Sequence, residues 1–122
     1  MIQVRTKLKI IDNSGAKVSN IIKILGGNNK KRANLANIAV ISIKKIKNKE
    51  SKVKKGEVHK LQILRLKDHF RRKDGSYMKY DEAGGILLKE SLSPLASRIN
   101  GPLNRELKRK FGKVTSLSKK LI

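Results

Sequence analysis

Hydrophobic and polar residues alternate through the first ten positions of the chain. Val4, Thr6, Leu8 and Ile10 have the same parity, and basic or polar residues fill the positions between them. Because successive side chains of a β-strand point to opposite faces, this period of two predicts a half-buried strand with a basic outer face. The segment 12–15, Asp-Asn-Ser-Gly, predicts a turn after it, since Asp and Asn bond their own backbone and Gly accepts a positive φ.

Further aliphatic runs predict further strands. They cover residues 21–25, 38–43, 58–66, 77–80 and 86–88. The run 38–43 is nearly continuous and β-branched, so we expect its strand to be buried on both faces. Residues 26–29 and Gly84-Gly85 predict breaks, and Asp74-Gly75 predicts a tight two-residue hairpin turn with a positive φ at both positions.

The pattern changes after residue 100. Leu103, Leu107 and Phe111 recur every four residues, as on one face of an amphipathic helix. Pro102 can begin such a helix without losing a needed N–H, and Gly112 lies where a C-terminal glycine cap is expected. We therefore expect about five or six short strands followed by one short helix, which favours a small closed barrel.

The length of 122 residues suits one domain and is too short for two. We expect a single domain over residues 1–122. The barrel and its hairpin loops would cover about 1–100, and the C-terminal helix and tail about 101–122.

Charge narrows the function. The chain carries 31 Lys and Arg against 9 Asp and Glu, a formal net charge of +22. A compact body of this size repels itself strongly at such a charge, so a polyanionic partner is expected. Nucleic acid is the first candidate, because it carries a negative charge every few ångströms. An anionic membrane surface is the second, and a soluble protein that is merely basic is the third.

Composition limits the other classes of function. Only 3% of the residues are aromatic, which predicts an aliphatic core and argues against a module that stacks single-stranded bases. A protein that grips folded RNA by its backbone and shape fits better. Cysteine is absent, which excludes disulfides and thiolate metal sites. No apolar run approaches the ~20 residues that span a bilayer, and the first residues resemble no targeting segment, so we expect no membrane partner and a protein that works where it is made.

Four basic stretches stand in predicted loops or at the predicted helix end: 30–32, 44–55, 71–73 and 108–110. Charge runs are often only solvated faces, but few acids balance these, so we expect phosphate contact for the set. Arginines are the stronger candidates, because a guanidinium fork binds phosphate with two hydrogen bonds. These are Arg71, Arg72, Arg98 and Arg105.

Candidate catalytic or metal-binding chemistry is weak. His59 and His69 have no carboxylate cluster around them, whereas zinc needs three or four convergent ligands. The segment 26–31 is superficially like a phosphate loop but lacks the spacing that such a loop requires. We expect no catalytic residues, no metal and no cofactor, and therefore no enzyme.

Five short segments, taken in order, carry a family resemblance. They are Asp12-Asn13-Ser14-Gly15-Ala16, Leu25-Gly26-Gly27, Val53-Lys54-Lys55-Gly56-Glu57-Val58, Arg71-Arg72-Lys73-Asp74-Gly75-Ser76 and Arg98-Ile99-Asn100-Gly101-Pro102. The chain resembles bacterial-type large-subunit ribosomal protein fourteen over essentially its whole length. Each segment is common by itself, but five in order are specific.

The resemblance implies a mainly β fold, a small five-stranded β-barrel with basic loops and a short C-terminal helical segment. It implies a structural constituent of the large ribosomal subunit that binds large-subunit rRNA directly. Such a protein sits at the subunit interface and contributes to an intersubunit bridge with small-subunit rRNA. Large-subunit proteins three and nineteen are the implied neighbours, and a ribosome-silencing factor is an implied partner.

The same resemblance suggests site residues. By position, Ser97, Arg98 and Lys113 match the family's exposed surface near the C-terminal helix, where we expect bridge or factor contacts. We assign rRNA contact to the basic positions Lys30, Lys31, Arg32, Lys44, Lys45, Lys47, Lys49, Lys52, Lys54, Lys55, Arg71, Arg72, Lys73 and Arg105.

Codon usage and divergence suggest a location. Lys outnumbers Arg by 23 to 8, and 14 Ile and 9 Asn accompany it; Lys, Ile and Asn have A/T-rich codons. Leu61, Ala83 and the end 117–122 depart from the family pattern. We expect a mitochondrial, organelle-encoded ribosomal protein, with a plastid or a low-GC bacterium as alternatives. The main rival function is a free-standing nucleic-acid binder, such as a chaperone or nucleoid protein.

Overall fold

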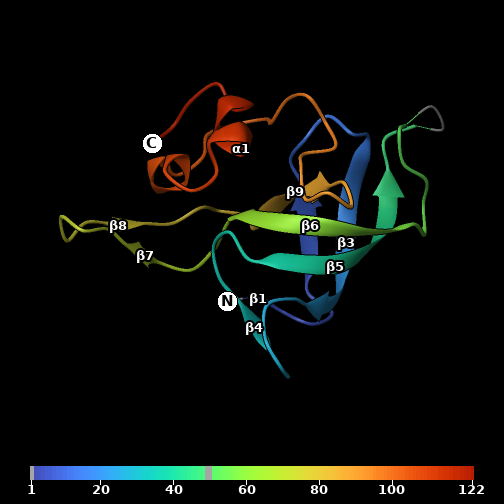
Figure 1. Cartoon of the computed structure of the whole chain (residues 1–122), viewed down its shortest axis with the longest axis horizontal. Coiled ribbons are helices and arrows are strands. Elements are labelled where there is room, and N and C mark those ends of the chain that lie inside the picture. The colour runs from blue at the N-terminus through green and yellow to red at the C-terminus, as the bar shows by residue number, and fades with distance from the viewer. Residues whose placement is uncertain (1, 49–50) are drawn as a thin grey trace.

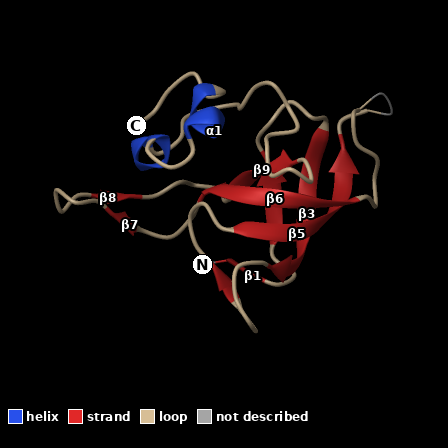
Figure 2. Ribbon diagram, in the orientation of Figure 1, coloured by secondary structure: helices blue, strands red, loops and turns tan. Residues whose placement is uncertain are grey.

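The computed structural model describes residues 2–48 and 51–122, and its centre is a closed five-stranded β-barrel (Figure 1, Figure 2). In order around the barrel the strands are β2 (Lys7–Ile10), β3 (Ala16–Ile24), β5 (Ile38–Ile46), β6 (Val58–Arg65) and β9 (Gly84–Leu88). Neighbouring strands are antiparallel, except that β2 and β9 close the barrel as a parallel pair. The predicted mainly β class and five-stranded barrel are confirmed.

The predicted first strand is interrupted. β1 (Ile2–Gln3) pairs with β4 (Arg32–Ala33), and β2 begins only at Lys7. Between them Arg5 has a φ of 70°, a left-handed backbone that breaks the period of two. Val4 is therefore 45% exposed, so its predicted place on the buried face is wrong, whereas Leu8 and Ile10 are buried as predicted.

The turn after β2 is confirmed and is held by a buried carboxylate. Asp12 is 2% exposed. Its Oδ1 accepts hydrogen bonds from the Ser14 N–H at 3.1 Å and the Ser14 hydroxyl at 2.5 Å, and its Oδ2 accepts one from the Leu87 N–H at 3.0 Å. Gly15 completes the turn with a φ of 97°, which favours glycine. Asp12 thereby joins the turn to β9.

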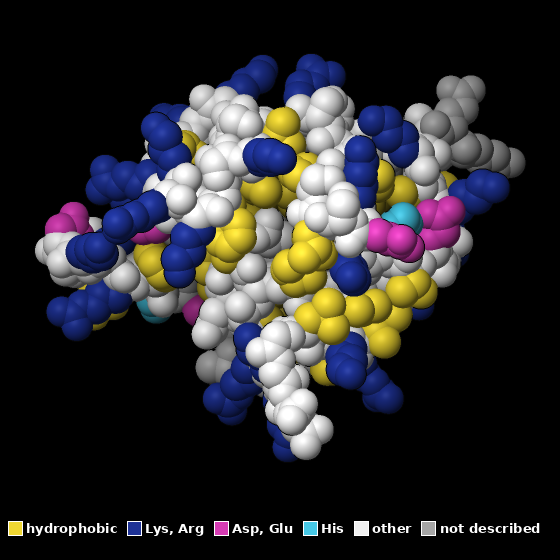
Figure 3. Space-filling view, viewed as in Figure 1, with side chains coloured by type: hydrophobic (Ala, Val, Ile, Leu, Met, Phe, Trp, Pro, Cys, Tyr) yellow, Lys and Arg dark blue, Asp and Glu magenta, His cyan; other side chains and the backbone are white. Residues whose placement is uncertain are grey.

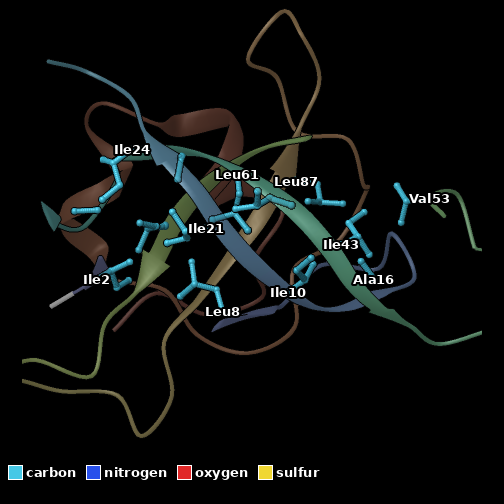
Figure 4. Close-up of a cluster of buried hydrophobic side chains, with 14 residues drawn as sticks. Ile2, Leu8, Ile10, Ala16, Ile21, Ile24, Ile43, Val53, Leu61 and Leu87 are labelled. Carbon is cyan, nitrogen blue, oxygen red and sulfur yellow. The ribbon is translucent and has the colours of Figure 1, made fainter. Parts of the chain in front are cut away.

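The barrel interior is aliphatic, as the composition predicts (Figure 4). Leu8, Ile21, Ile41, Ile43 and Leu61 are each at most 2% exposed. Removing one such side chain from water contributes about 1.5–3 kcal/mol. The cluster of buried side chains consists of Ile, Leu, Val and Ala, so the core is held by close packing of branched side chains.

β5 does not have two buried faces. Ala39, Ile41 and Ile43 are buried, but the residues between them are only half-buried. The prediction is wrong because a strand of a closed barrel has one face in the interior and one outside. The continuous hydrophobic run therefore contributes only every second residue to the barrel core.

Gly84 and Gly85 belong to β9 and do not form the predicted break. A Cβ on Gly85 would lie 2.5 Å from the Gln62 carbonyl oxygen and 2.6 Å from Leu61 Cδ2. Such distances are too short for a real Cβ, so glycine lets β9 lie close to β6. The pair is a packing requirement of the barrel.

Two short helical elements replace the predicted helix over 102–112. They are the 3-10 helix η1 (Arg105–Lys108) and the α-helix α1 (Gly112–Ser116). Leu103 stays extended because its N–H donates to the Lys120 carbonyl at 3.1 Å, and its carbonyl accepts from the Ile122 N–H at 2.9 Å. Gly112 begins α1, so its predicted role as a C-terminal cap is wrong.

A second hydrophobic cluster joins this C-terminal segment to the outside of the barrel. Leu103 and Leu107 are buried in it beside Leu64 and Ile86 of the barrel strands, with Phe111 half-buried against it. The predicted apolar face is therefore confirmed, although the helix is not. Figure 1 shows the segment lying against β6 and β9.

A hairpin, β7 (Phe70–Arg71) and β8 (Tyr77–Met78), projects from the barrel (Figure 1). Its turn is longer than the two residues predicted: the Arg72 N–H donates to the Ser76 carbonyl at 2.8 Å, and the Gly75 N–H donates to the Arg72 carbonyl at 3.0 Å. Gly75 has a positive φ of 90°, whereas Asp74 does not have one. The Asp74 carboxylate instead accepts the Ser76 N–H and hydroxyl, at 2.9 and 2.6 Å.

Candidate nucleic-acid interface

The basic segment after β5 is fastened to the barrel. Lys44 and Lys45 are exposed residues of β5 itself, so their prediction as loop residues is wrong. The loop begins after Ile46, and Val53, which is 2% exposed, anchors it in the barrel core. Its described lysines are all exposed: Lys47, Lys52, Lys54 and Lys55. Lys49 lies outside the described residues.

Close contact with the 12–15 turn also holds this loop in place. The Lys47 N–H donates to the Gly15 carbonyl at 2.7 Å. A Cβ on Gly15 would lie 2.5 Å from both Cβ and Oγ of Ser51, so only glycine permits this approach. The Ser51 hydroxyl in turn donates to the Asn48 carbonyl at 2.7 Å. Because the backbone at Lys47, Ser51 and Val53 is held against the barrel, ordering the neighbouring lysines on a partner costs less conformational entropy.

The basic segment 30–32 lies beside the β1–β4 pair. Lys31 and Arg32 are exposed, and Lys30 is half-buried. Arg32 pairs with Gln3 across β1 and β4, so its backbone is held in a ladder. Gly26, with a φ of 100°, turns the chain after β3 as predicted. Lys30 and Lys31 therefore lead directly into a strand that holds Arg32.

The arginines of the hairpin divide into one exposed and one internal residue. Arg71 and Lys73 are exposed. Arg72 instead lies with its Nε 3.0 Å from Glu106 Oε1 and its Nη2 3.0 Å from Met78 Sδ. Nη2 also donates to the main-chain oxygen of Ile122. Arg72 therefore ties the hairpin to the C-terminal segment, which leaves it little capacity for phosphate.

Arg105 is exposed on η1, and its charge lies near the Asp74 carboxylate of the hairpin turn. The Asp74 carboxyl has a lowered pKa, first because Ser76 donates hydrogen bonds to it and then because Arg105 and Arg72 lie near. Arg105 therefore lies near the hairpin turn that carries Asp74.

The three candidate bridge residues come from two segments that the fold brings close. The Asn13 side-chain oxygen accepts hydrogen bonds from the Ser97 and Arg98 N–H groups, each at 3.1 Å. The next residue, Ile99, donates to the Leu117 carbonyl at 3.2 Å and shares a hydrophobic cluster with Val114 of α1. Ser97, Arg98 and Lys113 are all exposed, so they flank one junction between the 12–15 turn and α1.

Basic side chains are spread widely over the face of the molecule that Figure 3 shows. Figure 3 shows Lys and Arg side chains around the outline of the visible face, with Asp and Glu in a few small groups. Among the acids, Glu82 pairs with Lys9 at 2.8 Å and Glu57 with His59 at 2.8 Å. Only one of the 31 Lys and Arg residues, Lys9, belongs to these two pairs, so a large excess of positive charge remains and the surface is suited to a polyanion.

Groups that could bind a metal ion do not converge in the described part of the chain. Over residues 2–48 and 51–122, no three of His, Asp and Glu form a potential metal site. His59 is half-buried against Glu57, and His69 packs edge-on to Tyr77 with ring centroids 6.1 Å apart. No helix in the described part of the chain has the length and apolar character that crossing a membrane requires.

Sequence reasoning missed two polar residues that position this surface. Arg65 donates from Nε to the Pro102 carbonyl at 3.1 Å and from Nη2 to the Asn100 carbonyl, and its guanidinium lies 5.7 Å from the Tyr80 ring centre. Burial lowers the pKa of Arg65, while Tyr80 and Glu82 act in the opposite direction. Asn13 is the second. Their partners lie 35 or more residues away, so no local pattern reveals them.

Fold and surface together define a small, strongly basic β-barrel protein whose charged loops are fastened to a rigid core. The family model described as Ribosomal protein L14p/L23e matches residues 1–122, the whole chain. The chain therefore belongs to the L14p/L23e family of ribosomal proteins. It is a structural, non-enzymatic component of the large ribosomal subunit, located in the ribosome with large-subunit rRNA and other ribosomal proteins.

Proposed function

We propose that this chain binds large-subunit rRNA directly through its basic segments and contributes to an intersubunit bridge through residues 97–98 and Lys113. The observation that carries the proposal is the fastening of exposed cations to the barrel, as in the loop held by Val53 and Gly15. A surface lysine on a mobile tail would lose more entropy on binding. Fixed cations suit a permanent structural contact.

The mechanism is electrostatic. Folded rRNA brings phosphates together that repel one another, and fixed cations between them stabilise one arrangement. The proposed rRNA contacts are Lys30, Lys31, Arg32, Lys44, Lys45, Lys47, Lys52, Lys54, Lys55, Arg71, Lys73 and Arg105, with Lys49 included from the sequence alone. Arg72 supports this set by holding the hairpin to Glu106.

The bridge surface is proposed as separate from the rRNA-binding segments. Ser97 and Arg98 are oriented by Asn13, and Lys113 stands on α1. We propose that small-subunit rRNA contacts this surface and that a ribosome-silencing factor would compete for it. Large-subunit proteins three and nineteen are proposed neighbours, on the family resemblance.

We further propose that residues 1–122 act as one domain in a mitochondrial ribosome, encoded in the organelle. The second hydrophobic cluster, which includes Leu64 and Leu103, supports one domain because it joins the C-terminal segment to the barrel. The abundance of Lys, Ile and Asn supports an A/T-rich organellar genome. A plastid or a low-GC bacterium is the alternative source.

The first experiment is a sucrose-gradient separation of the source lysate at a magnesium concentration that dissociates the subunits. Mass spectrometry then locates the chain. We expect it with the large subunit alone, at about one copy per particle, and retained through a high-salt wash. A chain at the top of the gradient, or spread over all RNA-containing fractions, would support the free-standing nucleic-acid binder instead.

The division of surfaces has its own test. Charge reversal at Arg98→Glu and Lys113→Glu should impair subunit joining while the large subunit still assembles. The matched control reverses Lys89 and Lys119, which are also exposed, and should join normally. If assembly and joining fail together, or if neither changes, residues 97–98 and Lys113 do not form a separate bridge surface.

A further inference from the structure

A hollow of about 900 Å³ runs along β2, and most of the cations that line it lie outside the four basic stretches 30–32, 44–55, 71–73 and 108–110. Its charged lining comes from β2, β3, the loop after β5, the end of β6 and the segment that follows β6: Lys7, Lys9, Lys17, Lys47, Arg65 and Lys67. The only acid that lines it among the described residues is Glu82. We call this hollow the β2 groove.

The close packing of β9 beside the β2 groove depends on a glycine. Apolar residues also line the groove: Ile2, Leu8, Ile10, Ile11, Ala16, Val18 and Ala83. Gly84 pairs with Lys9, and a Cβ on it would lie 2.8 Å from Ile11 Cγ2 and 3.3 Å from the Lys9 carbonyl oxygen. Glycine therefore lets β9 close against β2 without a side chain at this point. The hollow therefore has both apolar and cationic side chains in its lining.

Several cations of the β2 groove lie near the same carboxylate, Glu82. Lys9 Nζ lies 2.8 Å from Glu82 Oε2. The pKa of Glu82 is lowered, first by its hydrogen bond to Lys9 and the Lys9 charge, and further by Lys67 and Arg65. Arg65 donates hydrogen bonds to the Pro102 and Asn100 carbonyls, and its positive charge still contributes to the lining of the groove. One carboxylate opposes six cations, so the groove attracts anions.

We propose that the β2 groove binds the sugar-phosphate backbone of an RNA strand, as a second RNA-binding surface of this protein. No aromatic residue of the described chain lines it, so base stacking has no platform there, whereas phosphates can meet the lysines. Lys47 belongs both to the groove and to the basic loop after β5. The groove therefore continues the proposed rRNA-binding surface, and the inference rests on that proposed function.

The first test measures how the affinity for deproteinised large-subunit rRNA depends on salt. The groove variant carries Lys7→Gln, Lys17→Gln and Lys67→Gln; the control carries Lys79→Gln, Lys89→Gln and Lys119→Gln, also exposed lysines. Since each phosphate contact contributes about 0.7–0.9 to the slope of log K against log salt, the groove variant should lose about 2–3 from that slope. If affinities converge near 1 M salt, this corresponds to about 10²–10³-fold weaker binding at about 0.1 M.

The outcomes separate the groove from the proposed function. If the unaltered chain shows no salt-dependent binding to rRNA, the proposed function fails. If the unaltered chain binds and the groove variant keeps its slope, or the control loses as much, the groove is not an RNA site. Circular dichroism of both variants should match that of the unaltered chain, because all six lysines are exposed.

The second test uses the intact large subunit. Acylation with a lysine-reactive ester should leave Lys7, Lys17 and Lys67 unmodified, and digestion with ribonuclease should make them reactive. Reaction in the undigested subunit would overturn the proposal. Protection that survives ribonuclease would overturn it too, because a neighbouring protein would then cover the groove.

Discussion

The strongest single prediction concerns the buried carboxylate of Asp12. Its two oxygens accept three hydrogen bonds, two from Ser14 and one from the Leu87 N–H. Asp12→Asn keeps the size but replaces one oxygen with an NH2 group. The new NH2 group then points either at the Ser14 N–H and hydroxyl or at the Leu87 N–H. At least one of these buried donors is left without an acceptor.

The magnitude follows from these bonds. A hydrogen bond to a charged acceptor contributes about 1.5–3 kcal/mol, and a buried donor without a partner costs about 1–3 kcal/mol. We expect the free energy of unfolding to fall by about 2–4 kcal/mol. With an unfolding entropy of about 2.1 cal/mol/K per residue, the melting temperature should fall by roughly 8–16 °C.

Urea unfolding followed by far-UV circular dichroism, in salt that screens the net charge, measures this change. The control is Asp81→Asn, which makes the same charge change at an exposed position and should alter stability by about 0.5 kcal/mol or less. If Asp12→Asn changes the free energy of unfolding no more than the control does, the three hydrogen bonds do not stabilise the fold as argued.

Three further changes test other parts of the structure. Gly85→Ala should lower stability by about 1–3 kcal/mol, since its Cβ would meet the Gln62 carbonyl at 2.5 Å; an unchanged melting temperature would contradict this. Arg72→Gln should loosen the hairpin by about 1 kcal/mol, because the Glu106 side chain of the pair is partly exposed, and should speed amide hydrogen exchange in β7 and β8. The lowered pKa of Asp74 means that its carboxylate stabilises the turn above the unfolded-state pKa and that this is lost as pH falls through the lower folded value; the Ser76 amide shift should therefore titrate with a midpoint below 3.8, and a higher midpoint would refute the assignment.

Alternation in the first segment and hydrophobic, β-branched runs further along the chain predicted most of the barrel strands. β6 (Val58–Arg65) lies within the predicted run 58–66, and β5 contains all of the run 38–43. Local chemistry also predicted the 12–15 turn. These predictions succeed because strand period and turn chemistry depend on residues only a few positions apart.

Predictions failed where a distant segment competes for the backbone. A four-residue period made 103–111 a credible helix, but Leu103 bonds to Lys120 and Ile122 and stays extended. The two glycines at 84–85 suggested a break between strands, but both belong to β9, and the carbonyl oxygen of Gln62 lies where a side chain of residue 85 would be. Short helices are marginal by themselves, so one long-range pair of hydrogen bonds is enough to displace them.

The candidate binding surface was likewise predicted only in part from the sequence. Net charge and basic stretches predicted a polyanion-binding surface, and the family resemblance predicted a ribosomal protein. They could not predict that Arg72 is held by Glu106, or that Lys7, Lys17 and Lys67 line one groove. Charge is additive along a chain, whereas the use of each charge depends on which residues the fold places beside it.

The sequence by itself determined the aliphatic core, the mainly β class and the strong positive charge, because each follows from composition or from contacts within a few residues. Tertiary structure alone decided the strand ends, the break at Arg5, the short helices and the grouping of lysines along β2. The physical reason is that these features depend on hydrogen bonds and close approaches between residues far apart in sequence, such as Asp12 with Leu87 and Gly84 with Ile11. Such pairs exist only once the barrel has closed.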